Sequence, residues 1–137
     1  MVEIEINYDG DLRCRAKHGL SGATIETDAP VDNHGLGEAF SPTDLCASSL
    51  GVCMLTILGI AAKKHGINVG DVKGRVIKEM SSDLPRRIAK ITIEIHVPLP
   101  DDHPKRELIE QAAMSCPVHF SLHPDIQKEI SWKWTNE

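Results

Sequence analysis

The chain has 137 residues, a length at which a single domain spanning residues 1–137 is expected. Its composition, with 41% hydrophobic and 26% charged residues, is that of an ordinary globular protein. The formal net charge is −5 and aromatic residues make up 4% of the chain, which argues against a nucleic-acid partner because phosphate binding needs clustered cations. Four cysteines are too few and too widely spaced for a disulfide framework.

The first ten residues, MVEIEINYDG, contain two glutamates and no lysine or arginine, which is not typical of a secretory signal or a transit peptide. Residues 45–62 form an eighteen-residue stretch without a charge, a length that would also suit a membrane span. Serine, threonine and glycine interrupt this stretch, and a helix apolar on all sides is equally expected in a soluble core. We therefore expect a cytoplasmic protein with reduced thiols that binds no membrane.

Two N-terminal segments, residues 2–8 and 12–17, alternate apolar and polar side chains and predict the strands of a hairpin. The turn between them contains an Asp-Gly dipeptide, which normally signals a two-residue loop. That loop would put apolar and charged residues on one face, whereas a three-residue loop over 9–11 pairs Ile6 with Cys14. We therefore expect the longer loop, with Cys14 pointing inward as a small core residue.

A long helix has clear start and stop signals. Ser41 fits the N-cap, Pro42 fits the first helical position, and Asp44, three residues after Ser41, completes a capping box. Two lysines and a histidine precede Gly66, as the helix dipole and a C-cap require. The sequence therefore predicts a helix from about residue 42 to residue 65.

The other elements follow from alternation and from proline positions. The predicted strands are residues 22–28, 72–80, 88–97 and 130–134, and a second helix is predicted over residues 104–115. Residues 29–40 have no period and predict a loop, and a loop of this length is often functional. The order βββ-α-ββ-α-β is typical of an α+β protein rather than a parallel α/β design.

The cysteines differ in context. Cys46 and Cys53 lie seven residues apart on the long helix, so about 10.5 Å of helix axis separates them and no disulfide can join them. A cysteine in a run of small and aliphatic residues is by default a packing residue. Cys116 instead precedes Pro117, which suits the first position of a new helix. A thiol that caps a helix N-terminus feels the helix dipole, which favours the thiolate and lowers the pKa.

Three side chains form an alternative constellation for a metal. Cys116, His119 and His123 have the spacing C-x2-H-x3-H, which on a helix places them on one face, and Cys53 is a possible fourth ligand for zinc. The spacing is weakly specific in a chain with seven histidines, so a metal is not our first expectation. The chain also has no phosphate-binding or dinucleotide-binding glycine motif.

Two motifs carry a resemblance to a known family. Residues 41–53 are SPTDLCASSLGVC, and residues 116–119 are Cys-Pro-Val-His. Together with the order of elements over nearly the whole chain, they resemble the OsmC/Ohr family, the osmotically inducible and organic hydroperoxide resistance proteins. The resemblance implies an OsmC-like α+β fold in which two intertwined subunits form a homodimer, with curved antiparallel sheets around central helices.

The resemblance also implies a chemistry, because the family reduces hydroperoxides with a cysteine pair and without metal, haem or flavin. By position, Cys53 resembles the peroxidatic cysteine and Cys116 the resolving cysteine. A thiolate attacks the peroxide and becomes a sulfenic acid, which a second thiol converts to a disulfide. A dithiol reductant, of the lipoyl type in this family, then restores both thiols by exchange. We therefore expect no cofactor, a small organic hydroperoxide as substrate, and a role in oxidative-stress defence.

The chain departs from the family in the groups that activate the thiol. The best-known members have a glutamate ten residues before the first cysteine, paired with an arginine, whereas this chain has Thr43 there, with Asp44 beside it. Nine residues at 100° each place Asp44 opposite Cys53 on the helix. Because burial alone raises the pKa of a thiol, a cation must lie near Cys53, and Arg13 and Arg15 are the candidates. These departures leave a second hypothesis open, a non-catalytic OsmC-like dimer that binds an apolar ligand or a metal at its interface.

Overall fold

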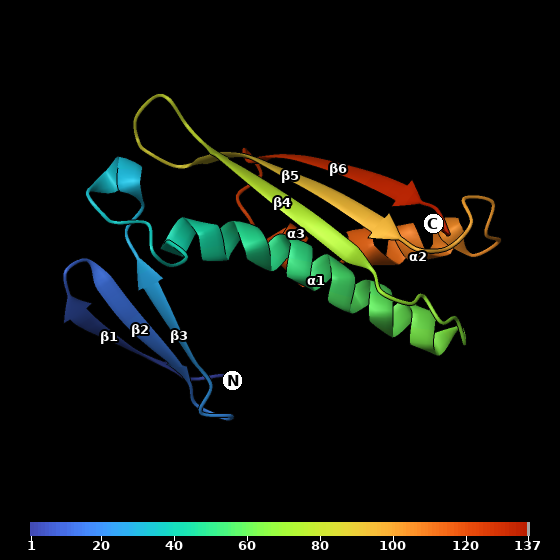
Figure 1. Cartoon of the computed structure of the whole chain (residues 1–137), viewed down its shortest axis with the longest axis horizontal. Helices are drawn as coiled ribbons and strands as arrows, with labels where there is room; N and C mark the ends of the chain where they lie inside the picture. Colours follow the sequence, from blue (N-terminus) through green and yellow to red (C-terminus); the bar gives the residue numbers. More distant parts are fainter. Residues whose placement is uncertain (137) are drawn as a thin grey trace. The chain divides into compact units, whose positions relative to one another are not determined.

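The computed structural model describes residues 1–136. The elements in chain order are β1 (Ile4–Gly10), β2 (Arg13–His18), β3 (Thr24–Asp28), a short 3-10 helix (Val31–Asn33), α1 (Pro42–Lys64), β4 (Lys73–Met80), β5 (Ile88–Val97), α2 (Arg106–Met114), α3 (Pro117–Ser121) and β6 (Gln127–Trp134) (Figure 1). The chain divides into two compact units, an N-terminal unit (Met1–Cys46) and a C-terminal unit that begins at Ala47. Each unit contains one three-stranded sheet, so the α+β class is confirmed.

The sheet of the N-terminal unit is antiparallel, in the order β1-β2-β3. Ile6 pairs with Ala16 and Tyr8 pairs with Cys14, so the predicted pairing of Ile6 with Cys14 is wrong by two residues. A shift of two keeps every side chain on its own face, because side chains alternate with a period of two. The hydrophobic pattern that favoured the three-residue loop therefore cannot distinguish the two registers.

The turn geometry decides the register. Asp11 and Leu12, with φ of 53° and 65°, occupy the two turn positions, as in a hairpin loop that needs positive φ at both residues. Gly10, with φ of 87°, lies where the pairing shifts between Tyr8 and Gly10. The glycine of the Asp-Gly dipeptide thus forms a bulge beside the turn instead of the turn itself.

The N-terminal unit leaves the apolar face of its sheet uncovered. Ile6, Ala16 and Ile25 form one row across the three strands, and Ile6 and Ile25 are 81% and 49% exposed. The buried residues among those described in this unit are Asp28 and Ser41, both polar. Cys14, predicted to be a core residue, is exposed. Within one chain, the apolar face of this three-stranded sheet is therefore exposed to solvent.

Helix α1 begins with the predicted capping box. The Ser41 backbone N–H donates to Asp44 Oδ2 at 2.9 Å, and the Asp44 N–H donates to Ser41 Oγ at 3.0 Å. The helix ends at Lys64, and Gly66 follows with φ of 66°, which is the left-handed conformation expected at a C-cap. Both predicted boundaries are therefore confirmed.

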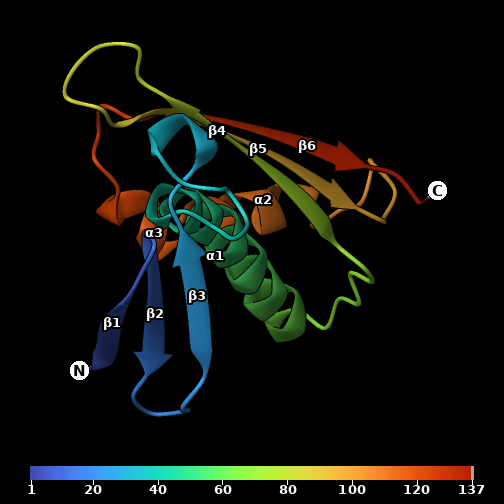
Figure 2. The same ribbon diagram turned by 60° about the vertical axis from the view of Figure 1, so that its left-hand side comes forward.

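The C-terminal unit has a mixed sheet in the order β4-β5-β6. The antiparallel arrangement expected for the sheets holds for β4 and β5, where Val76 pairs with Ile93, whereas β6 runs parallel to β5 and Ile130 pairs with Ile93. A parallel pair needs a crossover connection, and α2 and α3 lie in the segment between β5 and β6. Both views place α1 and α2 on the same face of this sheet (Figures 1 and 2).

The core of the C-terminal unit lies between its sheet and its helices. Alternate residues of β5 point into it, and α1 and α2 supply the other side; the most buried members are Leu50, Met54, Leu58, Ile91, Ile93, Ile95, Val97, Ile109 and Ala113. Gly51 permits a close approach of α1 to β4, because a Cβ there would lie 2.6 Å from Val76 Cγ2. Gly51 thus lets α1 pack closely against the sheet.

Helix α1 is only partly covered within one chain. It is long and apolar enough to cross a membrane by length and composition alone, and 33% of its most apolar window is buried. A core helix of a soluble protein passes the same test. The side chains of Val52 and Ile60 are 64% and 59% exposed, and Cys46, predicted to be a packing residue, is also exposed. One face of α1 therefore belongs to a core and another face remains apolar and open.

Candidate active site

The helix α1 carries Cys53 on the side that borders the core. Leu50 and Met54, close to it in the helix, are almost completely buried, whereas Cys53 is half-buried and packs against the core cluster. The sulfur is thus surrounded by aliphatic groups but is not sealed from solvent. This environment suits a thiol that must meet an apolar reagent.

The second thiol, Cys116, is completely buried and begins a helix. Its backbone is extended (φ −66°, ψ 141°), Pro117 occupies the first position of α3, and Cys116 Sγ accepts a hydrogen bond from the His119 backbone N–H at 3.3 Å. The proline fits because its fixed φ suits the first turn, where a missing N–H is not needed. The predicted capping role of Cys116 is confirmed.

The two thiols are neighbours although 63 positions separate them in the sequence. The thiol of Cys53 lies close enough to Cys116 to raise the pKa of the Cys116 thiol, and neither sulfur is in a disulfide. Both residues belong to the C-terminal unit. Cys53 lies on α1 and Cys116 caps α3. The structure places these two cysteines near each other, as the family resemblance implied.

Burial controls the protonation of Cys116. It raises the pKa of the thiol above its ordinary value; the hydrogen bond and the charge of Cys53 raise this pKa further, and the N–H groups of His119 and Val118 offset part of the rise. The expectation that the helix terminus lowers the pKa of Cys116 is thus wrong, because desolvation outweighs the N–H donors of this five-residue helix. Cys116 is held as a neutral thiol.

The two arginines that we expected near the Cys53 thiol, Arg13 and Arg15, bind carboxylates of the N-terminal unit. Arg13 Nη2 lies 2.8 Å from Glu38 Oε2 and 3.6 Å from Asp28 Oδ2. Arg15 binds Asp9 with two hydrogen bonds, of 2.7 and 3.1 Å, which raise the pKa of Arg15 and lower that of Asp9. Both arginines are therefore held by carboxylates of their own unit.

Two residues of this arrangement escaped the sequence analysis. Glu38 lies in the loop that precedes α1, and Asp28 ends β3 with a side chain that is completely buried. The Glu38 N–H donates to Asp28 Oδ2 at 3.1 Å, so the same carboxylate contacts both the loop and Arg13. The one sign of this ion pair in the sequence was that Glu38 is an acidic residue in an aperiodic loop. No spacing rule relates Glu38 to Arg13, which lies 25 positions earlier in the chain.

The first turn of α1 shows what Thr43 and Asp44 do. Asp44 completes the capping box, and Thr43 Oγ1 lies 3.2 Å from Ser41 Oγ. The expectation that Asp44 serves the helix terminus is confirmed. Thr43, at the position of the family's glutamate, is part of the same polar cluster at the start of the helix.

The alternative metal constellation does not form. Within residues 1–136, no group of three or more His, Cys, Asp and Glu side chains is placed to hold a metal ion. His123 is exposed and its Nδ1 accepts a hydrogen bond from the Asp125 N–H at 3.1 Å, while His119 packs edge-on against Phe120. The set Cys116, His119 and His123 is therefore not a metal site, because α3 ends at Ser121, before it reaches His123.

The chain belongs to the OsmC-like protein family, whose sequence model matches residues 35–131. The match covers most of the chain and includes both Cys53 and Cys116. A comparison with curated proteins finds no match.

Solved structures agree with this assignment. A protein from Psychrobacter arcticus 273-4, provisionally assigned to osmotic stress induction and the detoxification response, is 44% identical, with a TM-score of 0.89 and 96% of each chain covered. The organic hydroperoxide resistance protein OsmC from Legionella pneumophila is 13% identical, with a TM-score of 0.77 and coverage of 97% of this chain and 96% of that chain. An OsmC-like protein from Mycoplasma pneumoniae is 20% identical, with a TM-score of 0.77 and coverage of 98% and 97%. The fold is therefore that of OsmC-like proteins.

Proposed function

We propose that this protein is a thiol peroxidase that reduces organic hydroperoxides through Cys53 and Cys116. The observation that carries the proposal is the proximity of these two thiols within a single compact unit: half-buried Cys53 lies close enough to buried Cys116 to raise its pKa. Family membership supports a peroxide-related role, and the structural neighbour from Legionella pneumophila is named an organic hydroperoxide resistance protein.

The proposed cycle starts at Cys53, because it is the more accessible of the two sulfurs. Its thiolate attacks the terminal peroxide oxygen, the O–O bond breaks, and the alkoxide takes a proton and leaves as an alcohol. Cys53 is then a sulfenic acid. Cys116 attacks this sulfur, its proton and the sulfenic oxygen leave as water, and a disulfide remains. A dithiol, of the lipoyl type by family resemblance, reduces the disulfide by exchange and is itself oxidised to a disulfide.

The protonation states fit this order of events. A thiolate reacts far faster than a thiol, so Cys116, whose pKa is raised by burial, does not compete for the peroxide. Its position beside Cys53 instead makes it the group that captures the sulfenic acid.

The experiment is peroxide consumption with cumene hydroperoxide and a dithiol reductant. Cys53→Ser is expected to abolish turnover, and Cys46→Ser, on the same helix two turns earlier, is the matched control and is expected to retain it. If Cys53→Ser consumes peroxide as fast as the wild type, the proposal is wrong. In that case the alternative function, binding of an apolar ligand without catalysis, becomes the better account.

We also propose that the active form is a homodimer. The uncovered apolar row of the N-terminal sheet (Ile6, Ala16, Ile25) and the open apolar face of α1 (Val52, Ile60) support this proposal. Exposed apolar surface of this extent is typical of an interaction surface rather than of a monomer. A second copy of the chain is the partner that the family resemblance implies.

A further inference from the structure

The thiol of Cys116 has to lose a proton when it closes a disulfide with Cys53, yet its surroundings hold that proton in place. Cys116 is completely buried, and burial is the main cause that raises its pKa. The groups that lower this pKa are the backbone N–H groups of His119 and Val118, and they offset only part of the rise. The resolving step therefore needs a group that accepts the proton.

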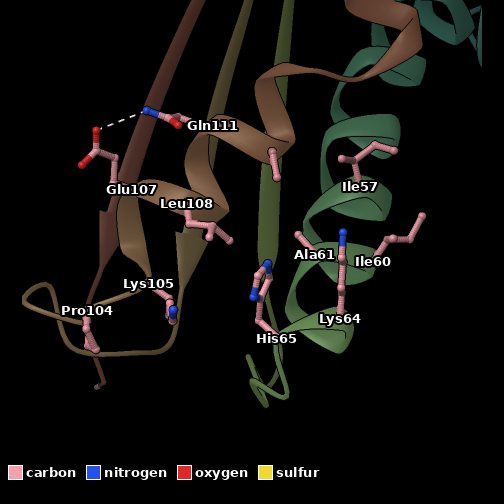
Figure 3. A pocket seen from close by; sticks show the side chains of 11 residues that line it. Ile57, Ile60, Ala61, Lys64, His65, Pro104, Lys105, Glu107, Leu108 and Gln111 are labelled. Atoms are coloured by element: carbon pink, nitrogen blue, oxygen red, sulfur yellow. Dashed lines mark hydrogen bonds between the residues drawn. The ribbon is translucent and has the colours of Figure 1, made fainter.

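An open groove in the C-terminal unit does not bring solvent to this thiol. The groove lies between the second half of α1 and α2, has a volume of about 720 Å³, and is walled by residues such as Ile57, Ala61 and Leu108 (Figure 3). Neither Cys53 nor Cys116 lines it. Because the groove gives the buried thiol no route to water, a side chain packed beside the thiol is the better acceptor.

His119 is the titratable residue of α3. It is the third residue of the helix that Cys116 caps, and its backbone N–H donates to Cys116 Sγ at 3.3 Å. A helical side chain leans toward the N-terminus of its helix and covers the turn that precedes its own Cα. The imidazole of His119 therefore leans over the turn that begins at Cys116.

The two ring nitrogens of His119 lie in different environments. Nδ1 is buried and has no hydrogen-bond partner among residues 1–136, whereas Nε2 is not enclosed in this way. The ring packs edge-on against Phe120, with 5.3 Å between the ring centroids, and His119 forms no ion pair within the same residues. A buried polar atom without a partner is rare in proteins. An imidazole with one enclosed nitrogen and one that reaches the surface is suited to proton transfer.

We propose that His119 is the general base of the resolving step and that its Nδ1 takes the proton of Cys116. As Cys116 Sγ attacks the sulfenic sulfur of Cys53, its proton moves to Nδ1 and the S–S bond forms. The S–O bond of Cys53 breaks, and the leaving hydroxide takes the proton from His119 and departs as water. His119 ends neutral, so the step consumes no further reactant. The proposal rests on the proposed function of the two cysteines.

The test measures disulfide formation separately from the oxidation of Cys53. Reduced protein receives one equivalent of cumene hydroperoxide in a quenched-flow instrument, and dimedone then labels the remaining Cys53 sulfenic acid. At neutral pH we expect His119→Asn to slow the loss of sulfenic acid by at least about tenfold, because the amide cannot accept the proton. Formation of the sulfenic acid should keep its wild-type rate. His123→Asn, an exposed histidine just beyond α3, is the matched control and should resolve like the wild type.

The pH profile distinguishes a base from a structural support. The wild-type rate of disulfide formation should rise first where histidine titrates and again where the thiol ionises. His119→Asn and a second variant, His119→Gln, should lose the first rise and approach the wild-type rate at alkaline pH, because the Cys116 thiolate then attacks without a base.

Three results would overturn the proposal. A wild-type resolving rate in His119→Asn would exclude His119 as the base. Equal slowing of both variants at every pH would assign it a structural role. If the wild type forms neither a sulfenic acid nor a disulfide, the proposed peroxidase itself fails, and the role of His119 fails with it.

Discussion

The side chain of Cys53 lies close enough to Cys116 to raise the pKa of that thiol, which is completely buried and accepts a hydrogen bond from the His119 N–H at the start of α3. The half-buried sulfur on α1 and the buried sulfur at the α3 terminus therefore differ in access to solvent although they are neighbours. A two-step thiol reaction needs one sulfur that the substrate can reach and a second, protected sulfur close to it.

The raised pKa of Cys116 predicts how the second step depends on pH. Since burial favours the neutral thiol, disulfide formation from the Cys53 sulfenic acid should accelerate as pH rises through and above the ordinary thiol range. Stopped-flow fluorescence after one equivalent of cumene hydroperoxide measures this step. A rate that is independent of pH up to the alkaline limit of stability would contradict the assignment of a neutral Cys116.

The same shift affects stability. The folded-state pKa of Cys116 is raised above the unfolded value, so its contribution to the free energy of unfolding is fully present below the unfolded pKa and is lost as pH rises through the folded pKa. The wild type should therefore lose stability with rising alkaline pH, and Cys116→Ala should lose less over the same range. Urea unfolding at a series of pH values compares the two; parallel curves would refute the prediction.

The arginines give a third prediction. Arg15 is bound by Asp9 through two nitrogens, whereas Arg13 contacts Glu38 and Asp28 through Nη2 alone, so Arg13 has more donors left for another group. We expect Arg13→Gln to slow the oxidation of Cys53 by at least about tenfold, because loss of a cation raises the pKa of a thiol. Arg15→Gln is the matched variant and should change the rate much less.

The measurement is the second-order rate constant for cumene hydroperoxide, together with thiolate absorbance at 240 nm as a function of pH. Equal effects of the two substitutions, or none from either, would show that neither arginine activates Cys53. The presence of Thr43 in place of the family's glutamate would then indicate that the Cys53 thiolate forms without an arginine.

The apolar row of the N-terminal sheet predicts the oligomeric state. Ile6 is 81% exposed in one chain, and covering such a side chain is worth about 1.5–3 kcal/mol. Ile6→Glu should therefore shift the protein from dimer to monomer in light scattering coupled to gel filtration. Glu5→Gln, on the opposite face of β1, should remain dimeric. A wild type that is monomeric at micromolar concentration would reject the dimer.

The capping box predicts a purely structural role for Asp44. Asp44→Ala removes the acceptor for the Ser41 N–H and should lower the free energy of unfolding by about 1 kcal/mol. Peroxide reduction per folded molecule should be unchanged, because the carboxylate acts on the helix terminus. Urea unfolding and activity on the same preparation check both statements, and a loss of activity without a loss of stability would assign Asp44 to the reaction.

Sequence reasoning succeeded where local chemistry decides the structure. The bounds of α1 followed from Ser41, Pro42, Asp44 and Gly66, and the capping position of Cys116 followed from Pro117, because these signals act within one turn of backbone. The pairing of Cys53 with Cys116 came from family resemblance instead, since no local rule relates two residues so far apart in the chain.

The errors have a common physical origin in tertiary structure. The β1–β2 register depends on which residues adopt positive φ, and Asp11 and Leu12 do so although neither is glycine. The pKa of Cys116 depends on how deeply Cys116 itself is buried, which the residues beside it in the sequence do not reveal. The exposure of Cys14 depends on what covers its sheet, and within one chain its apolar face remains open.

The central claim is that Cys53 and Cys116 act as one redox pair, and a thiol count tests it most directly. Reduced protein treated with one equivalent of cumene hydroperoxide, without reductant, should lose two of its four thiols, and peptide mass spectrometry should find a Cys53–Cys116 disulfide within one chain. Cys116→Ser should lose one thiol and carry a sulfenic acid on Cys53 that dimedone captures. Four thiols remaining after complete exposure to the hydroperoxide, or a disulfide that involves Cys14 or Cys46 instead, would contradict the account.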